Sequence, residues 1–219
     1  MRMVFISLQR GAPPLGRFWN AIRSEKRNIT FAALVFVFFT LVGYFYHDLI
    51  GQWMKQAGVW DQFEQKAEAI QENPGLWNTF GLIFFNNLLA SVSMIFLGIF
   101  LGIYPLLGLT FNGLLVGVVL GSVSQQAGIS PLTLFATRIL PHGVLELPAV
   151  IFAAAYGIRL GALVVRSLAA LLSPSGLGER HRSAWRTFFA RIPVLFGGVA
   201  VMLIVAALIE SSLIVYFSK

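Results

Sequence analysis

Long apolar runs separated by short polar segments dominate the chain. Most of them approach the roughly 20 residues that an α-helix needs to cross the hydrocarbon core of a bilayer. The alternating segments typical of a membrane β-barrel are absent from this pattern. We therefore expect an all-α, polytopic membrane helix bundle with about five spanning helices, at residues 29–46, 79–103, 109–123, 143–165 and 192–217.

Residues 124–142 interrupt this pattern. Gln125, Gly128 and Pro131 favour a turn, and the apolar stretch that follows is long enough for only one short helix. Backbone that is not helical is tolerated at membrane depth only where protein or water covers it. We therefore expect a re-entrant broken helix here, packed against the spans.

The charged residues predict how the chain is oriented in the membrane. Lysine and arginine outnumber acids six to one in residues 1–28 and six to one in 159–191, whereas acids outnumber them five to two in 47–78. Cytoplasmic segments carry the positive excess. We expect a single domain over residues 1–219 of a multi-pass cell-membrane protein, with the N-terminus cytoplasmic and the C-terminus outside. This orientation explains the net charge of +7 better than nucleic-acid binding does.

Three polar segments lie outside the spans. Residues 1–28 predict either a helix on an anionic leaflet or an ordinary solvated charge run. Residues 47–78 predict an external amphipathic helix whose acidic row of Glu64, Glu68 and Glu72 either docks a partner or is solvated surface. Residues 166–191 predict a basic cytoplasmic loop.

Small residues recur at four-residue spacing along three of the spans. Such ridges are typical of helices that approach closely in membranes. We expect the fourth-span ridge to pack against the third-span ridge. The amount of small-residue surface also predicts a homodimer or larger oligomer, although packing within one chain can use it all. The helix-packing residues are Gly98, Gly102, Gly113, Gly117, Gly121, Gly157 and Gly161.

The segment Pro141–Pro148 places a histidine and a carboxylate inside an apolar run. His142 and Glu146 are four residues apart, so they share one face of a helix. An ionisable residue in a membrane span is costly enough to suggest function. The alternative is structural: His142 caps the helix end while Glu146 hydrogen-bonds to a neighbouring helix.

Buried polar groups in lipid must find one another, so we expect a polar core with Arg138 as the charge partner of Glu146. This core is either a neutral hydrogen-bonded network or a site that binds a cation or passes protons. His142 and Glu146 alone offer two ligands, too few for zinc, so no metal site or cofactor is predicted. The chain has no cysteine and no catalytic motif, which predicts that it is not an enzyme. The expected core consists of Asn86, Asn87, Asn112, Arg138, His142 and Glu146.

Several short patterns occur along the chain: Asn86-Asn87, Gly98-x-x-x-Gly102, Asn112-Gly113-x-x-x-Gly117, Ile139-Leu140-Pro141-His142-Gly143-x-x-Glu146-Leu147-Pro148-Ala149 and Gly157-x-Arg159-x-Gly161. Together they resemble the stage II sporulation protein M family. The resemblance implies a multi-pass inner-membrane protein; in spore formers the family member is similar to a scaffold that recruits peptidoglycan-degrading partners during engulfment. We therefore expect a membrane scaffold for cell-envelope partners, with a channel or transporter subunit as the alternative.

Overall fold

The computed structural model describes residues 14–72, 74–172 and 178–217, which form helices joined by short turns, with no strand in these ranges. Arg2, Arg10, Asn73 and the serine- and proline-containing run at 173–176 lie outside the described residues. The elements are α2 (Pro14–Ser24), α3 (Lys26–Phe45), α4 (His47–Gln56), α5 (Val59–Glu72), α6 (Leu76–Phe96), η1 (Leu97–Ile99), α7 (Ile103–Ala127), α8 (Pro131–Leu134), the π-helix η2 (Phe135–Ile139), α9 (Leu140–Leu171) and α10 (Glu179–Phe217).

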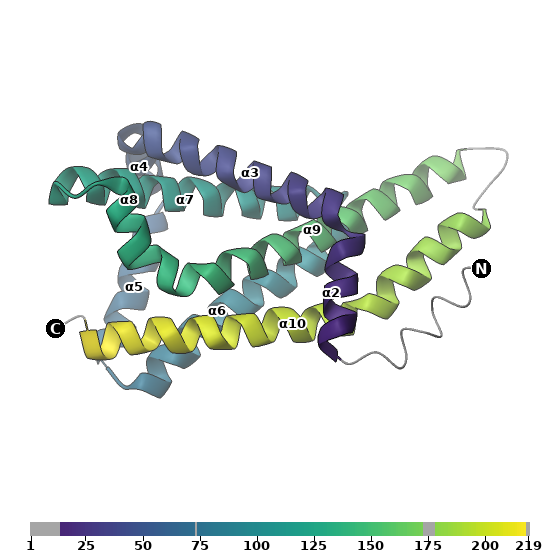
Figure 1. Ribbon diagram of the computed structural model, residues 1–219. Helices are drawn as coiled ribbons and strands as arrows, with labels where there is room; N and C mark the ends of the chain where they lie inside the picture. The colour runs from purple at the N-terminus through teal and green to yellow at the C-terminus, as the bar shows by residue number, and fades with distance from the viewer. Residues whose placement is uncertain (1–13, 73, 173–177, 218–219) are drawn as a thin grey trace.

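Five helical stretches are long and apolar enough to cross a membrane: Lys26–Phe45, Leu76–Ile99, Ile103–Ala127, Pro131–Ala170 and Glu179–Tyr216. They run along the long axis of the molecule, and α2 crosses them at a steep angle (Figure 1). The helices α4, α5 and α8 lie toward one end of the molecule, the left-hand end in Figure 1, which we call the α8 end. The prediction of an all-α membrane bundle with five spanning helices is confirmed.

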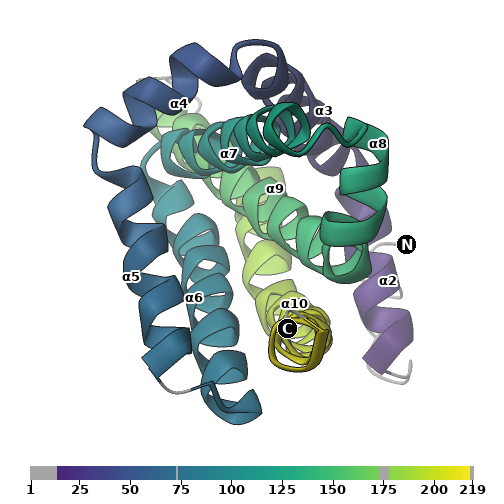
Figure 2. The ribbon, with the colours of Figure 1, turned by 90° about the vertical axis from the view of Figure 1, so that its left-hand side faces the viewer.

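Helix α9 occupies the centre of the bundle. The view along the spans shows it between α7, α6 and α10 (Figure 2), and it also contacts α3. Ala149, Ala153 and Ala154 have no exposed surface. Because alanine side chains are short, neighbouring helices can approach α9 from several sides along this stretch.

The glycine ridge of α7 packs against α3. A methyl group added at Gly113 would meet the carbonyl oxygen of Phe36, and one at Gly117 would meet that of Thr40. Gly121 lies beneath the ring of His47. The prediction that this ridge faces the fourth-span ridge was therefore wrong: equal spacing of small residues marks a close-packing surface without specifying its partner.

The glycines of α9 pack instead against the turn between α6 and α7. Gly157 lies against the backbone of Gly98 and Met94, and Gly161 lies against Gly102. Leu101 and Gly102 adopt left-handed backbone, with φ of 56° and 77°. This conformation disfavours a non-glycine residue, so the turn tolerates strain at Leu101 while it contacts α9.

A broken helical segment lies where the sequence predicts one, but its boundaries differ. Residues 124–127 complete α7, and Gly128 ends that helix with a left-handed φ of 65°. The Ser130 hydroxyl then caps α8 by accepting a hydrogen bond from the Thr133 N–H at 3.1 Å. The chain passes through the π-helix directly into α9, with a bend that Figure 1 shows clearly. The segment thus places the first turn of α9 at the α8 end of the bundle.

Candidate functional site

Three titratable side chains from two helices converge at the α8 end. His142 and Glu146 lie one turn apart on α9, and Glu210 approaches them from α10. One potential ligand atom from each residue lies within 4.8 Å of the others. We call His142, Glu146 and Glu210 the carboxylate cluster.

A third helix reaches this cluster through an amide. The Asn87 Nδ2 group of α6 donates a hydrogen bond to Glu146 Oε1 at 2.9 Å. The exposed Asn86 donates in turn to Asn87 Oδ1 at 3.3 Å. The Asn87 amide thus orients the Glu146 carboxylate from the side of α6.

A polar groove makes the carboxylate cluster accessible. It has a volume of ≈ 570 Å³ and lies between the α8–η2 segment and the last turns of α10. Thr133, Thr137, Arg138 and His142 line it from the stretch α8–η2–α9, and Glu210, Leu213 and Ile214 line it from α10. Two members of the carboxylate cluster therefore lie in its wall.

The cluster has the donor groups that a cation or proton site requires. Two carboxylates at this separation repel each other when both are ionised, unless a proton or a cation lies with them. His142 Nδ1 is buried and has no hydrogen-bond partner among the described residues. The cluster therefore offers one imidazole and two carboxylate groups as donors to a metal ion or a proton.

The structure brings together part of the expected polar core. Asn86, Asn87, His142 and Glu146 lie in one network, whereas Asn112 donates to the Gly108 carbonyl oxygen of its own helix at 2.8 Å. The expected pairing of Arg138 with Glu146 is not observed: Arg138 is exposed on the groove wall, and no ion pair joins these two described residues.

Sequence reasoning missed Glu210 as a member of the cluster. The signal was present, because Glu210 is an acid within an apolar run, the same feature that marked Glu146. In the sequence it lies only near the outer end of the last span. The sequence argument therefore counted two ligands where the structure assembles three.

A second polar cluster lies near α2. Glu25, between α2 and α3, is 2% exposed and makes an ion pair with Arg159 of α9. Arg191 of α10 lies 3.6 Å from the same carboxylate, and Asn28 donates to it at 2.9 Å. Each cation finds a partner and none of these groups faces an open cavity, which is typical of a structural tie between helices.

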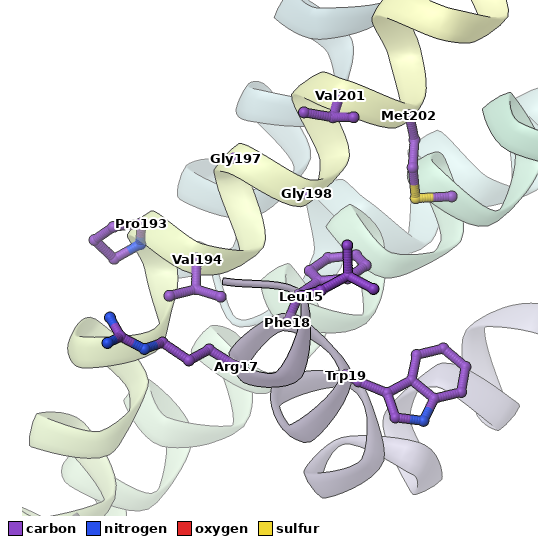
Figure 3. Close-up of a pocket in the computed structure, with 10 residues that line it drawn as sticks. All are labelled: Leu15, Arg17, Phe18, Trp19, Pro193, Val194, Gly197, Gly198, Val201 and Met202. Atoms are coloured by element: carbon purple, nitrogen blue, oxygen red, sulfur yellow. The ribbon is translucent and has the colours of Figure 1, made fainter. Parts of the chain in front are cut away.

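An apolar groove of ≈ 590 Å³ separates α2 from α10. Figure 3 shows Leu15 and Phe18 of α2 beneath Gly198 and Met202 of α10, and the Phe18 ring contacts Gly198. Almost all of its lining is apolar. It therefore offers no chemistry comparable to that of the carboxylate cluster, which is the stronger candidate for a functional site.

Comparison with known proteins places the chain in a family. The chain is 36% identical over 87 residues to an uncharacterised protein of Methanocaldococcus jannaschii, an alignment that covers 40% of this chain and 48% of the relative. The matched region thus spans about half the length of this curated relative. No solved structure matches the chain. The model of the family described as stage II sporulation protein M matches residues 32–213, which include all seven helix-packing glycines and the carboxylate cluster. The chain therefore belongs to the stage II sporulation protein M family.

Proposed function

We propose that this protein is a non-enzymatic membrane scaffold that gathers cell-envelope proteins, including partners that remodel peptidoglycan. The observation that carries the proposal is an apolar stretch of the central helix between the two polar clusters. Residues 147–155 of α9 are all apolar, and Ala149, Ala153 and Ala154 among them have no exposed surface. Since Glu146 and Arg159 are 13 residues apart, this stretch separates them by roughly 20 Å of helix. A scaffold needs no polar residues along such a stretch, whereas a channel needs a polar path past it.

Helix α5 supplies the docking surface in this proposal. Its main contacts are with its neighbours α4 and α6. Glu64, Glu68 and Glu72 are exposed along it, and no described side chain forms an ion pair with them. The acidic row is therefore open to a basic partner outside the bundle.

The basic segments define the other face. The long helices α9 and α10 continue past α2 on the side away from α8 (Figure 1). This hairpin bears Arg166, Arg182 and Arg186. The proposal places it in the cytoplasm, beside the leaflet or an acidic partner, with α2 lying in the interface.

A homodimer or larger oligomer remains part of the proposal. The glycine ridges do not support it, because α3, α6, α7 and α9 use them against one another. Native mass spectrometry in mild detergent measures the oligomeric state directly. Detection of the monomer alone would contradict the proposed oligomer.

The scaffold is tested by photo-cross-linking in the membrane of living cells. A cross-linking residue at the exposed Gln65 of α5 should trap a discrete envelope protein, and the triple variant Glu64→Lys, Glu68→Lys, Glu72→Lys should abolish that adduct. The same cross-linker at Leu34, exposed on the membrane-spanning α3, is the matched control and should trap no such protein. An adduct that survives charge reversal, or no adduct at Gln65, contradicts the docking surface.

A channel or transporter subunit is the second candidate, favoured by the groove that leads to the carboxylate cluster. Interrupted helices often mark transport sites, and the α8–η2 segment interrupts regular α-helix with a π-helix before α9. Liposomes containing the wild-type protein or the Glu146→Gln variant separate the two functions. A cation or proton flux that depends on Glu146 would overturn the scaffold.

A further inference from the structure

We propose that His142, Glu146 and Glu210 bind one divalent transition-metal ion of the zinc class at the α8 end of the bundle. The site would join α9 to α10 and leave one coordination position open to the groove. This inference goes beyond the scaffold and does not depend on it. A scaffold can exist without the metal, and the metal can bind whatever the partners are.

The donor set fits such an ion. Zinc binds imidazole nitrogen and carboxylate oxygen at about 2.0–2.2 Å, so ligand atoms of a tetrahedral site lie about 3.3 Å apart. The three candidate atoms already lie within 4.8 Å of one another. Side-chain rotations that bring these atoms up to about 1.5 Å closer together would therefore close the site. The absence of cysteine and the presence of imidazole favour zinc-class metals over softer or harder ions.

Charge gives a second reason. The two carboxylates carry two negative charges when ionised, and a divalent cation neutralises both. An uncompensated charge in a membrane span is costly, and Arg138 does not pair with Glu146. A metal ion would thus replace a repulsion with two attractive contacts.

The surroundings of the ligands are those of a metal site. Ligands of a bound metal are usually held by further hydrogen bonds that fix their orientation. Asn87 holds the Glu146 carboxylate through Oε1 at 2.9 Å, which orients this side chain beside the other two ligands. His142 Nδ1 is buried without a hydrogen bond among the described residues, so one polar atom of the ring has no partner there.

The groove provides entry and a fourth ligand. The groove has a volume of ≈ 570 Å³, lies beside His142 and Glu210, and is also lined by Thr133 and Thr137. Catalytic and exchangeable zinc sites have three protein ligands and one position for water or another molecule. The arrangement of three ligands beside a polar groove matches that coordination pattern.

Zinc binding to the full-length protein tests the proposal. The protein is purified in detergent with a tag that contains no histidine, dialysed against a chelator, and titrated with Zn²⁺ in competition with a chromophoric chelator. We expect one zinc ion per chain. Glu210→Gln should weaken affinity by about 100-fold or more, and Asn87→Ala by roughly 10- to 100-fold. The matched controls are Glu68→Gln and His47→Gln, acid and imidazole residues outside the cluster, which should bind zinc as the wild type does.

A second measurement keeps the test decisive if a variant fails to fold. Wild-type protein loaded with Co²⁺ should show visible absorption bands that one equivalent of Zn²⁺ removes. Zinc should also raise the unfolding temperature of the wild type, and the chelator should reverse this. The proposal is overturned by wild-type protein that binds no zinc, by unchanged affinity in Glu210→Gln, or by an absence of Co²⁺ bands.

Discussion

The carboxylate of Glu25, at the junction of α2 and α3, makes an ion pair with Arg159 in the middle of α9. Arg191 of α10 lies 3.6 Å from the same carboxylate and donates to the Ser24 hydroxyl at 2.5 Å. One residue at the start of the bundle is thereby connected to its central helix and its last helix. The contact fixes where α2 turns into α3.

Replacing Glu25 with glutamine should destabilise the protein, because Arg159 would lose its counter-charge in a largely buried setting. We expect a loss of about 2 kcal/mol, below the full value for a fully buried pair because Arg159 remains partly exposed. Thermal unfolding in detergent measures the change. Glu179→Gln is the control, since Glu179 is exposed and lies 3.7 Å from Arg182. Equal unfolding temperatures for the two variants would contradict the role assigned to Glu25.

Adding a methyl group at Gly117 should destabilise the protein more than adding one at Gly81. At Gly117 it would collide with the Thr40 carbonyl oxygen of α3, whereas at Gly81 nothing lies within 4 Å. Overpacking typically costs about 1–3 kcal/mol, so we expect Gly117→Ala to lower the unfolding temperature and Gly81→Ala to leave it unchanged or slightly higher. Similar effects of the two substitutions would show that α3 and α7 do not pack as described.

The contact between α4 and α7 should depend on pH through His47. Its Nδ1 lies 2.9 Å from the Tyr44 carbonyl oxygen and its Nε2 lies 3.0 Å from Gln125 Oε1, so only the doubly protonated ring can donate to both acceptors. The hydrogen bond to Gln125, then that to Tyr44, raises the pKa of His47 above its usual 6.5. Stabilisation by this contact is therefore full below pH 6.5 and is lost as pH rises through the raised pKa.

The Gln125→Leu variant isolates this effect. We expect the wild type to exceed the variant in unfolding temperature by more at about pH 5.5 than at about pH 8.5. Comparing the two proteins at each pH removes the contribution of other titrating groups. A difference that stays constant over this range would show that His47 does not titrate in contact with Gln125.

Cysteine labelling decides the orientation in the membrane. The natural chain has no cysteine, so Gln65→Cys in α5 and Gly178→Cys before α10 each introduce a single reactive thiol. The charge distribution predicts that an impermeant reagent added outside intact cells labels position 65 and leaves position 178 unlabelled. Labelling of both positions from one side would contradict the proposed topology.

The spans were predictable because hydrophobicity is a local property of the chain. That Asn87 and Glu146 share one polar core was predictable for a related reason, although Arg138 was the partner expected for Glu146: a polar group within an apolar run has few acceptable surroundings, so the polar groups of such runs meet. Asn112 escaped this rule because its amide reaches the Gly108 carbonyl oxygen one turn away. A backbone carbonyl group of the same helix thus accepts the hydrogen bond that we expected Asn112 to make with a distant side chain.

The choice of helix partners was not predictable from spacing. The ridges at Gly113 and Gly157 have the same spacing of small residues, so nothing in the pattern says that the first meets α3 and the second meets α6. The role of Glu25 was equally unpredictable. This residue is the single acid in a basic segment, and its role depends on Arg159 and Arg191, which only the folded chain brings to it.

The packing of α3 against α7 rather than against α6 has a consequence for biosynthesis. The first span is synthesised well before α7. The surface of α3 around Gly43, which packs against the backbone of Leu114 in the folded protein, is therefore exposed to lipid until α7 has been inserted. Spans that are stable individually can associate after insertion. Two separately expressed fragments, divided in the connection between α5 and α6, should therefore find each other in the membrane and co-purify, with the α3–α7 contact acting as the seam.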